Sequence, residues 1–186
     1  MTSFLRALAL AAVAGAGAAP AATAATVFAT SVVEYNEGAG ITEAARRITG
    51  NALGAPDGKF LSLGLGGSAI IDFGTAFRAA MTVTEVTFGN RADHVETMDI
   101  FGLATLVGPA TFLGTVSNAA MTATLDFAGI FRYLKVVDTS PAMPGRDGFD
   151  IDSISVAAIP LPASGGLLAL GLLGAAALRR RRPAQA

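Results

Sequence analysis

The chain of 186 residues contains no cysteine, no tryptophan, one histidine and two tyrosines. Without cysteine the protein can form neither a disulfide nor a thiol nucleophile, so buried apolar side chains or bound ions must stabilise the fold. A single histidine excludes a metal site built on a histidine pair. No phosphate-binding loop, zinc-protease motif or nucleophile elbow occurs. We therefore expect a protein that is not an enzyme.

Residues 1–25 have the order of parts found in a secretory signal peptide. Arg6 precedes an alanine-rich apolar run, and the small residues Ala22-Thr23-Ala24 fit the cleavage site of signal peptidase. We expect export, processing by signal peptidase, and a mature chain that starts at Ala25 or Thr26. The alternative is an alanine-rich N-terminus with no targeting role.

The C-terminal segment 159–186 combines three features of a membrane anchor. A proline motif, Ile159-Pro160-Leu161-Pro162-Ala163, precedes an apolar run over 167–178, and four basic residues follow: Arg179, Arg180, Arg181 and Arg182. The apolar run can form a transmembrane helix, and the arginines stay on the cytoplasmic side of the membrane. As a helix, residues 165–178 extend only about 21 Å, less than the ~30 Å hydrocarbon core, which suits a temporary anchor.

This tail resembles the PEP-CTERM sorting signal in the variant written Val-Pro-Leu-Pro-Ala, with Ile159 in place of valine. The resemblance implies cleavage near residues 162–164 by an exosortase-like enzyme. It also implies a transient stay in the inner membrane of a Gram-negative bacterium, followed by delivery to the cell surface or the extracellular matrix. A matrix polysaccharide is then an expected partner.

Between these two segments, the body over 26–158 carries eight basic and fourteen acidic residues, a net charge of −6. A surface that binds nucleic acid needs clustered lysine and arginine, so we expect no nucleic-acid partner. The negative charge is compatible with cation binding. The length of the body fits one domain with a core of its own.

Apolar and polar residues alternate with a period of two across the body, between turns rich in glycine, asparagine, aspartate and proline. This pattern predicts strands over 26–33, 60–63, 68–73, 82–88, 97–103, 111–116, 122–127, 133–137 and 152–157. One helix is predicted over 42–48, with Thr42 as its N-cap. Because helices that could connect parallel strands are missing, we predict an all-β antiparallel sandwich or jelly roll, with a signal helix in the N-terminal segment and a transmembrane helix in the C-terminal one.

Several segments of the body also resemble the discoidin or galactose-binding-like jelly-roll family of secreted bacterial domains. They are Asn51-Ala-Leu-Gly-Ala-Pro-Asp-Gly58, Leu61-Ser-Leu-Gly-Leu-Gly-Gly-Ser68, Ile71-Asp-Phe-Gly74, Phe131-Arg-Tyr-Leu-Lys-Val-Val-Asp-Thr139 and Gly148-Phe-Asp-Ile-Asp152. The resemblance implies a β-sandwich with loops at one end and a structural calcium ion between an early loop and the final strand.

Oxygen-bearing side chains at predicted strand ends and turns form a candidate calcium site, consisting of Asn36, Asp57, Asp150 and Asp152. Calcium binds carboxylate, amide and carbonyl oxygens, and glycine-rich loops expose such carbonyls. Asp150 and Asp152 alternate with Phe149 and Ile151, so the carboxylates share one face of a strand while the apolar pair faces the core. The alternative is an ordinary strand with a polar outer face.

His94 lies in a polar segment between two predicted strands, close in sequence to Asp93 and Glu96. Either carboxylate could orient it, but we expect a solvated loop histidine. Taken together, the sequence predicts an exported surface or matrix protein that acts as a binding or structural module. The alternative is a calcium-dependent, lectin-like carbohydrate-binding module, and a secreted hydrolase is less favoured.

Overall fold

The computed structural model describes residues 24–159. Nearly all of the expected signal peptide and the expected sorting tail from Pro160 onward lie outside these residues. In the described part of the chain, no helix is long and apolar enough to cross a membrane.

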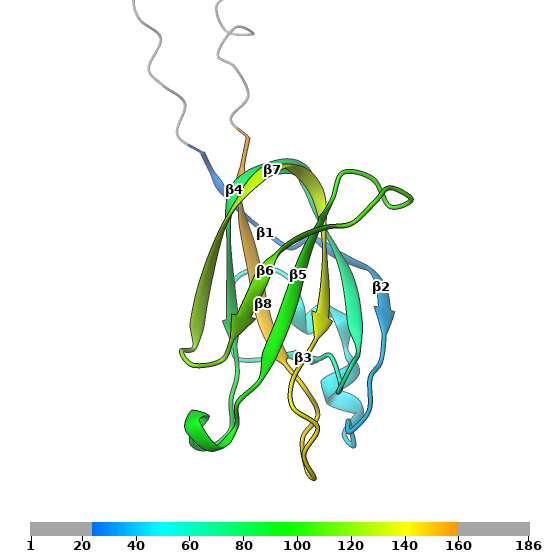
Figure 1. Ribbon diagram of the computed structural model, residues 1–186, viewed down its shortest axis with the longest axis vertical. Coiled ribbons are helices and arrows are strands. Elements are labelled where there is room, and N and C mark those ends of the chain that lie inside the picture. Colours follow the sequence, from blue (N-terminus) through cyan, green and yellow to red (C-terminus); the bar gives the residue numbers. More distant parts are fainter. Residues whose placement is uncertain (1–23, 160–186) are drawn as a thin grey trace, which may run out of the picture. The chain divides into compact units, whose positions relative to one another are not determined.

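The described residues fold into an all-β antiparallel sandwich, with three short 3-10 helices between strands (Figure 1). The elements in chain order are β1 (Thr26–Phe28), β2 (Ser31–Asn36), η1 (Ala44–Arg47), η2 (Thr49–Ala52), β3 (Leu61–Ser62), β4 (Ser68–Glu85), η3 (Arg91–Asp93), β5 (Thr97–Leu103), β6 (Thr111–Ser117), β7 (Thr122–Asp138) and β8 (Asp150–Ala158). The predicted all-β antiparallel class is therefore confirmed.

Two long, bent strands, β4 and β7, belong to both layers of the sandwich. Residues 68–72 of β4 pair with β2 and with the end of β7, whereas residues 77–84 pair with the start of β7 and with β8. The hydrogen-bond register of β4 shifts between Asp72 and Phe77 and again between Arg78 and Ala80. These irregularities let the chain arch from one layer to the other, as the top of Figure 1 shows.

Separate strands are predicted over 68–73 and 82–88 and over 122–127 and 133–137, which is wrong, because β4 and β7 are each continuous. Gly74 and Gly129 look like turn residues, but both lie within continuous strands with positive φ angles of 71° and 107°. Glycine adopts such angles without strain, so the strand bends here and continues. Conversely, the predicted strand 26–33 is interrupted at Ala29 and Thr30. There the backbone changes its partner, because Ala29 donates to Ile154 and Thr30 donates to Asp72.

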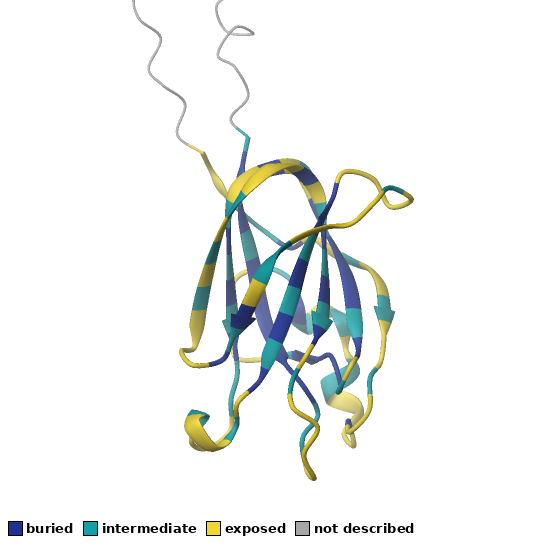
Figure 2. Cartoon of the chain, in the orientation of Figure 1, coloured by how far each residue is buried: buried dark blue, intermediate teal, exposed yellow. Residues whose placement is uncertain are grey.

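The core lies between the layers and is built from the alternate residues of their strands, which appear dark in Figure 2. Its largest fully buried side chains are Phe73, Phe77, Phe149, Leu61, Leu63, Ile71, Met81, Met98, Ile100, Leu134, Ile151 and Ile154. Phe77 packs against Phe73, Phe127 and Phe131 with ring centroids 5.1–6.4 Å apart. Burial of these apolar side chains supplies the stabilisation that disulfides cannot provide here.

The predicted helix over 42–48 is only the four-residue 3-10 helix η1. Glu43, and not Thr42, occupies its N-cap position, and no side chain caps it. So short a segment cannot form a stable α-helix by itself. Its two arginines bind other loops: Arg46 contacts Asp147, and Arg47 contacts Glu37.

Candidate ligand-binding site

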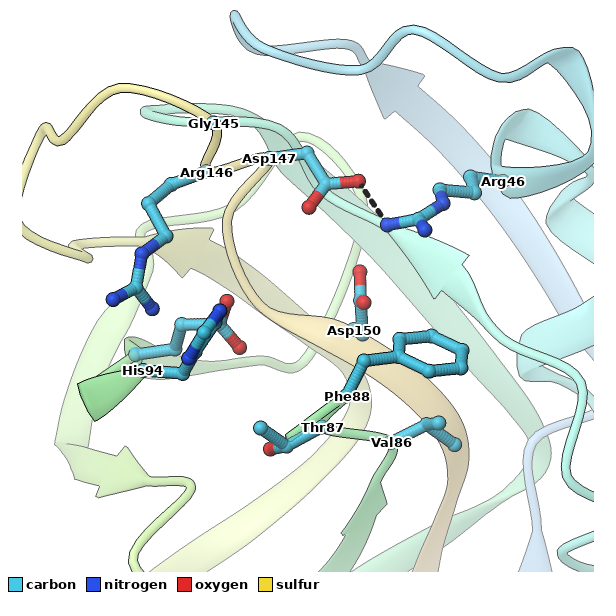
Figure 3. A pocket seen from close by; sticks show the side chains of 10 residues that line it. Arg46, Val86, Thr87, Phe88, His94, Gly145, Arg146, Asp147 and Asp150 are labelled. Carbon is cyan, nitrogen blue, oxygen red and sulfur yellow. Dashed lines mark hydrogen bonds and ion pairs between the residues drawn. The ribbon is translucent and has the colours of Figure 1, made fainter. Parts of the chain in front are cut away.

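A small cavity of about 140 Å³ opens at the end of the sandwich where β8 begins. This end is opposite to the one where β1 begins and β8 finishes (Figure 1). The cavity, called the loop-end pocket below, is lined by Arg46, Val86, Thr87, Phe88, His94, Glu96, Gly145, Arg146, Asp147 and Asp150. These residues come from η1, from the segment between β4 and β5, and from the segment leading into β8 (Figure 3).

One wall of the pocket is an arginine held between aromatic rings and a carboxylate. The Arg46 Nη1 donates to Asp147 Oδ2 at 2.6 Å. The guanidinium carbon of Arg46 lies 5.3 Å from the centroid of Phe60 and 5.4 Å from that of Phe88. Cation–π contact and a charge-assisted hydrogen bond together fix the direction of this side chain.

The opposite wall is the segment that carries His94 and Glu96, and the buried Asn118 fixes its position. The Asn118 Oδ1 accepts from the Glu96 backbone at 3.0 Å, and Asn118 Nδ2 donates to the His94 carbonyl at 2.6 Å. Nearby, Arg91 pairs with the buried Glu85 and also donates to Thr87. These contacts hold both pocket residues on a rigid support.

Two carboxyl groups of the pocket, Glu96 and Asp150, are almost completely buried, with 5% and 4% of their surface exposed. Burial raises the pKa of Glu96 to about 8, and the neighbouring carboxylates of Asp150 and Glu85 add to the shift. Burial likewise raises the pKa of Asp150 to about 8, opposed by the Ser62 hydroxyl and increased by Asp147. Both groups therefore retain most of their protons near neutral pH.

The pocket also collects polar atoms that have no partner. Within residues 24–159, the buried side-chain atoms that make no hydrogen bond are Arg46 Nε, His94 Nδ1, Arg146 Nη1 and Asp150 Oδ1. All four belong to residues that line the loop-end pocket. A buried polar atom without a partner costs about 1–3 kcal/mol. A bound ligand that hydrogen-bonds these atoms would recover that energy.

Among the predicted calcium residues, the structure brings Asp57 and Asp152 together. The contact joins the Asp152 side chain to the backbone of Asp57 and not to its carboxylate. The Asp152 carboxylate accepts from the backbone nitrogens of Asp57 and Gly58 at 3.0 and 3.1 Å. The Asp57 carboxylate binds Lys59, and Asn36 donates to Glu34 on its own strand. Within residues 24–159, no group of three or more histidine or acidic side chains is close enough to hold a metal ion. Calcium binding at these residues stays a prediction.

Two expectations about individual side chains need correction. Asp150 and Asp152 are both buried, at a point where the pairing of β8 with β4 shifts its register. The two carboxylates therefore do not lie on an ordinary polar outer face. His94 is not simply solvated, because its Nδ1 atom is buried in the pocket.

Sequence reasoning missed the structural role of Asp138. Its carboxylate accepts from the backbone of Gly66 and Phe149, both at 2.9 Å, and from the Ser140 hydroxyl at 2.6 Å. It thereby fixes the loop that leads to Asp150. The Asp-Thr-Ser sequence that ends β7 was the available signal, because aspartate often hydrogen-bonds nearby backbone groups.

No family model matches the chain, and no curated protein matches it. A chain in the crystal structure of reduced XRCC1 bound to the DNA polymerase β catalytic domain is similar with a TM-score of 0.53 and 10% identity. The match covers 73% of this chain and 100% of that one. CBM32-1 from a family 31 glycoside hydrolase of Clostridium perfringens is similar with a TM-score of 0.47 and 14% identity, over 63% of this chain and 88% of that one.

A Ruminococcus gnavus GH29 fucosidase is similar with a TM-score of 0.44 and 16% identity, over 60% of this chain. The match covers only 22% of the fucosidase, so this chain spans about a fifth of that protein's length. At these identities the likeness concerns the fold alone. The described part of the chain is an all-β antiparallel sandwich.

Proposed function

We propose that this protein is a carbohydrate-binding module and that its ligand binds in the loop-end pocket. The observation that carries the proposal is the set of four buried polar atoms of the pocket residues that make no hydrogen bond, of which Arg46 Nε lies 3.6 Å from Glu43 Oε2. Arg46 Nε and Arg146 Nη1 can only donate a hydrogen bond. Asp150 Oδ1 accepts one as long as this oxygen does not itself carry the proton. A sugar hydroxyl both donates and accepts, so one small polyol complements this mixed set.

The size and rim of the pocket also support a sugar. A cavity of about 140 Å³ is smaller than the ~300–1,000 Å³ of pockets that take drug-sized molecules, so it suits one small unit. Phe88 contributes to the lining and remains 58% exposed. Its ring offers an apolar face to the C–H groups of a sugar. All of these groups belong to the protein, so the proposal requires neither calcium nor catalysis.

A matched pair of measurements tests the proposal. The full-length protein is screened against immobilised glycans, including matrix polysaccharide, together with Arg146→Ala and His94→Ala. We expect each pocket variant to weaken binding at least tenfold with an unchanged melting temperature. Arg132→Ala is the control, because it removes an arginine that pairs with Asp72 outside the pocket. If no glycan is retained, or if the pocket variants bind as the wild type does, the proposal is wrong.

The two terminal segments support a cellular role for this module. The order of parts in residues 1–25 and 159–186 favours export, transient anchoring in the inner membrane, and exosortase-like processing. The protein would then present its pocket at the cell surface or in the matrix. Mass spectrometry of the released protein should find a C-terminus near residues 162–164. Recovery of peptides that contain Arg179 from the extracellular form would contradict this processing.

A further inference from the structure

The charges around the loop-end pocket do not balance. Four carboxyl groups and three guanidinium groups lie in or beside it, namely Glu85, Glu96, Asp147, Asp150, Arg46, Arg91 and Arg146. Asp147 is paired with Arg46, and Glu85 with Arg91. Within the described part of the chain, Glu96, Asp150 and Arg146 form no ion pair. With all four carboxyls ionised, the group is therefore one positive charge short.

The hydrogen bonds of the two unpaired carboxyls are also incomplete. Asp150 Oδ1 is buried and has no partner. The Glu96 carboxyl accepts one long hydrogen bond, of 3.4 Å, from Asn118 Nδ2. A third atom on the same pocket, His94 Nδ1, is buried without a partner and can accept in one of the two neutral tautomers. The pocket thus offers acceptors to a group that carries several N–H donors.

Protons bound to Glu96 and Asp150 now supply two positive charges, one more than the group lacks when all four carboxyls are ionised. The raised pKa values of Glu96 and Asp150 mean that the empty pocket avoids burying two uncompensated negative charges by keeping the carboxyls neutral. A ligand with a compact positive charge would remove that constraint. Its charge would stabilise the ionised carboxyls, and its N–H groups would supply the missing hydrogen bonds.

We propose that the sugar bound by this pocket carries a free primary amine and that its ammonium group lies between Glu96 and Asp150. This inference rests on the proposed carbohydrate-binding function and names the ligand class: an amino sugar that is not N-acetylated. An ammonium group has three N–H donors, which Asp150 Oδ1, Glu96 and His94 Nδ1 can accept. The Nη1 atom of Arg146, whose Nη2 donates to the Asp93 carbonyl, is left for the sugar hydroxyls.

Binding of the ammonium group releases one proton from the pocket. The ammonium keeps its three N–H bonds, while the O–H bond of one carboxyl breaks and that proton leaves to solvent. Affinity for the amine therefore rises with pH as long as the amine stays protonated, which for an amine of pKa near 7.7–8.0 means up to about pH 7.5. One released proton gives up to about tenfold per pH unit, or about 30-fold between pH 6 and pH 7.5.

Other charged groups face the two carboxyls and could favour a different ligand. Arg146 lies near Glu96, Arg46 lies near Asp150, and His94 is a further titratable group on the wall. A sugar carboxylate could instead bind Arg146 and accept hydrogen bonds from the protonated carboxyls. Affinity for such an acidic sugar would fall as pH rises, which is the opposite dependence.

Titration calorimetry of the full-length protein distinguishes these cases. Glucosamine, N-acetylglucosamine, glucose and glucuronic acid are titrated between about pH 6 and pH 7.5. Buffers of different ionisation enthalpy report the number of protons released. We expect glucosamine to bind more tightly than the two neutral sugars, with a preference that grows with pH and with proton release. Glu96→Gln and Asp150→Asn should each reduce that preference at least tenfold.

One control accompanies these variants. Asp126→Asn removes a carboxylate from an exposed position on β7 and should leave the preference unchanged. Equal binding of all four sugars, or a preference for glucuronic acid, would overturn the amine inference and leave the carbohydrate proposal intact. If none of the sugars binds, the carbohydrate proposal itself fails.

Discussion

The buried carboxyl of Asp150 makes the stability of this protein depend on pH in an unusual direction. Its pKa is about 8 in the folded protein, compared with 3.8 for the unperturbed group. The folded state therefore holds a proton that the unfolded state releases, so the free energy of unfolding decreases as pH rises between these two values. The stabilisation is complete below about pH 4, is lost progressively, and reaches its full loss above about pH 8.

The magnitude follows from the same two pKa values. Between pH 6 and pH 8, linkage at ~1.4 kcal/mol per pH unit, with the slope flattening near the folded pKa, gives a loss of about 2 kcal/mol from this one group. For a domain of this size, that corresponds to a decrease of roughly 5–10 °C in melting temperature. Urea unfolding at pH 6, 7 and 8 measures the change directly. Asp150→Asn, which cannot ionise, should remove this share of about 2 kcal/mol and leave the share of Glu96, whose pKa is also about 8. A wild-type protein whose stability is constant or increases over this interval would refute the reasoning.

Three further predictions concern other parts of the sandwich. Gly148→Ala should destabilise the protein by several kcal/mol, because φ is 77° and an added Cβ would lie 2.7 Å from the Gly64 backbone; thermal unfolding tests this, and a loss below ~1 kcal/mol would contradict it. Asp152→Ala should cost about 1–3 kcal/mol by removing the acceptor for two backbone N–H groups, with Asp126→Ala as the silent control. If calcium binds at Asp150 or Asp152, the ion should raise the melting temperature and a chelator should lower it, whereas identical melting curves would leave calcium without a role.

Strand positions were predictable because alternation of apolar and polar residues directly reflects the two faces of a sheet. What the pattern could not reveal is that β4 and β7 are each one continuous strand. Whether Gly74 opens a turn or occupies a bend depends on hydrogen bonds to partner strands, which are set by residues far away in sequence. The local sequence therefore shows where the chain changes direction, but not whether the strand ends there or continues.

The loop-end pocket was only partly predictable for a similar reason. Asp150 was identified as a candidate ligand residue because aspartates at strand ends are readily recognised. Its neighbours in the pocket, Arg46, His94 and Arg146, come from segments about 50 residues apart, and no local pattern connects them. The burial of Asp150 and Glu96, which creates their unusual chemistry, arises only when these segments pack together.

The position of β8 has a mechanical consequence. The strand begins at the pocket with Asp150 and ends at Ala158, directly before the expected sorting tail. Tension between a polysaccharide bound in the pocket and the C-terminal end of the described chain would run lengthwise along β8. Hydrogen bonds to β4 and β1 run perpendicular to the strand, so many of them would resist the load at the same time instead of opening one after another. The sandwich would therefore bear such a load in shear.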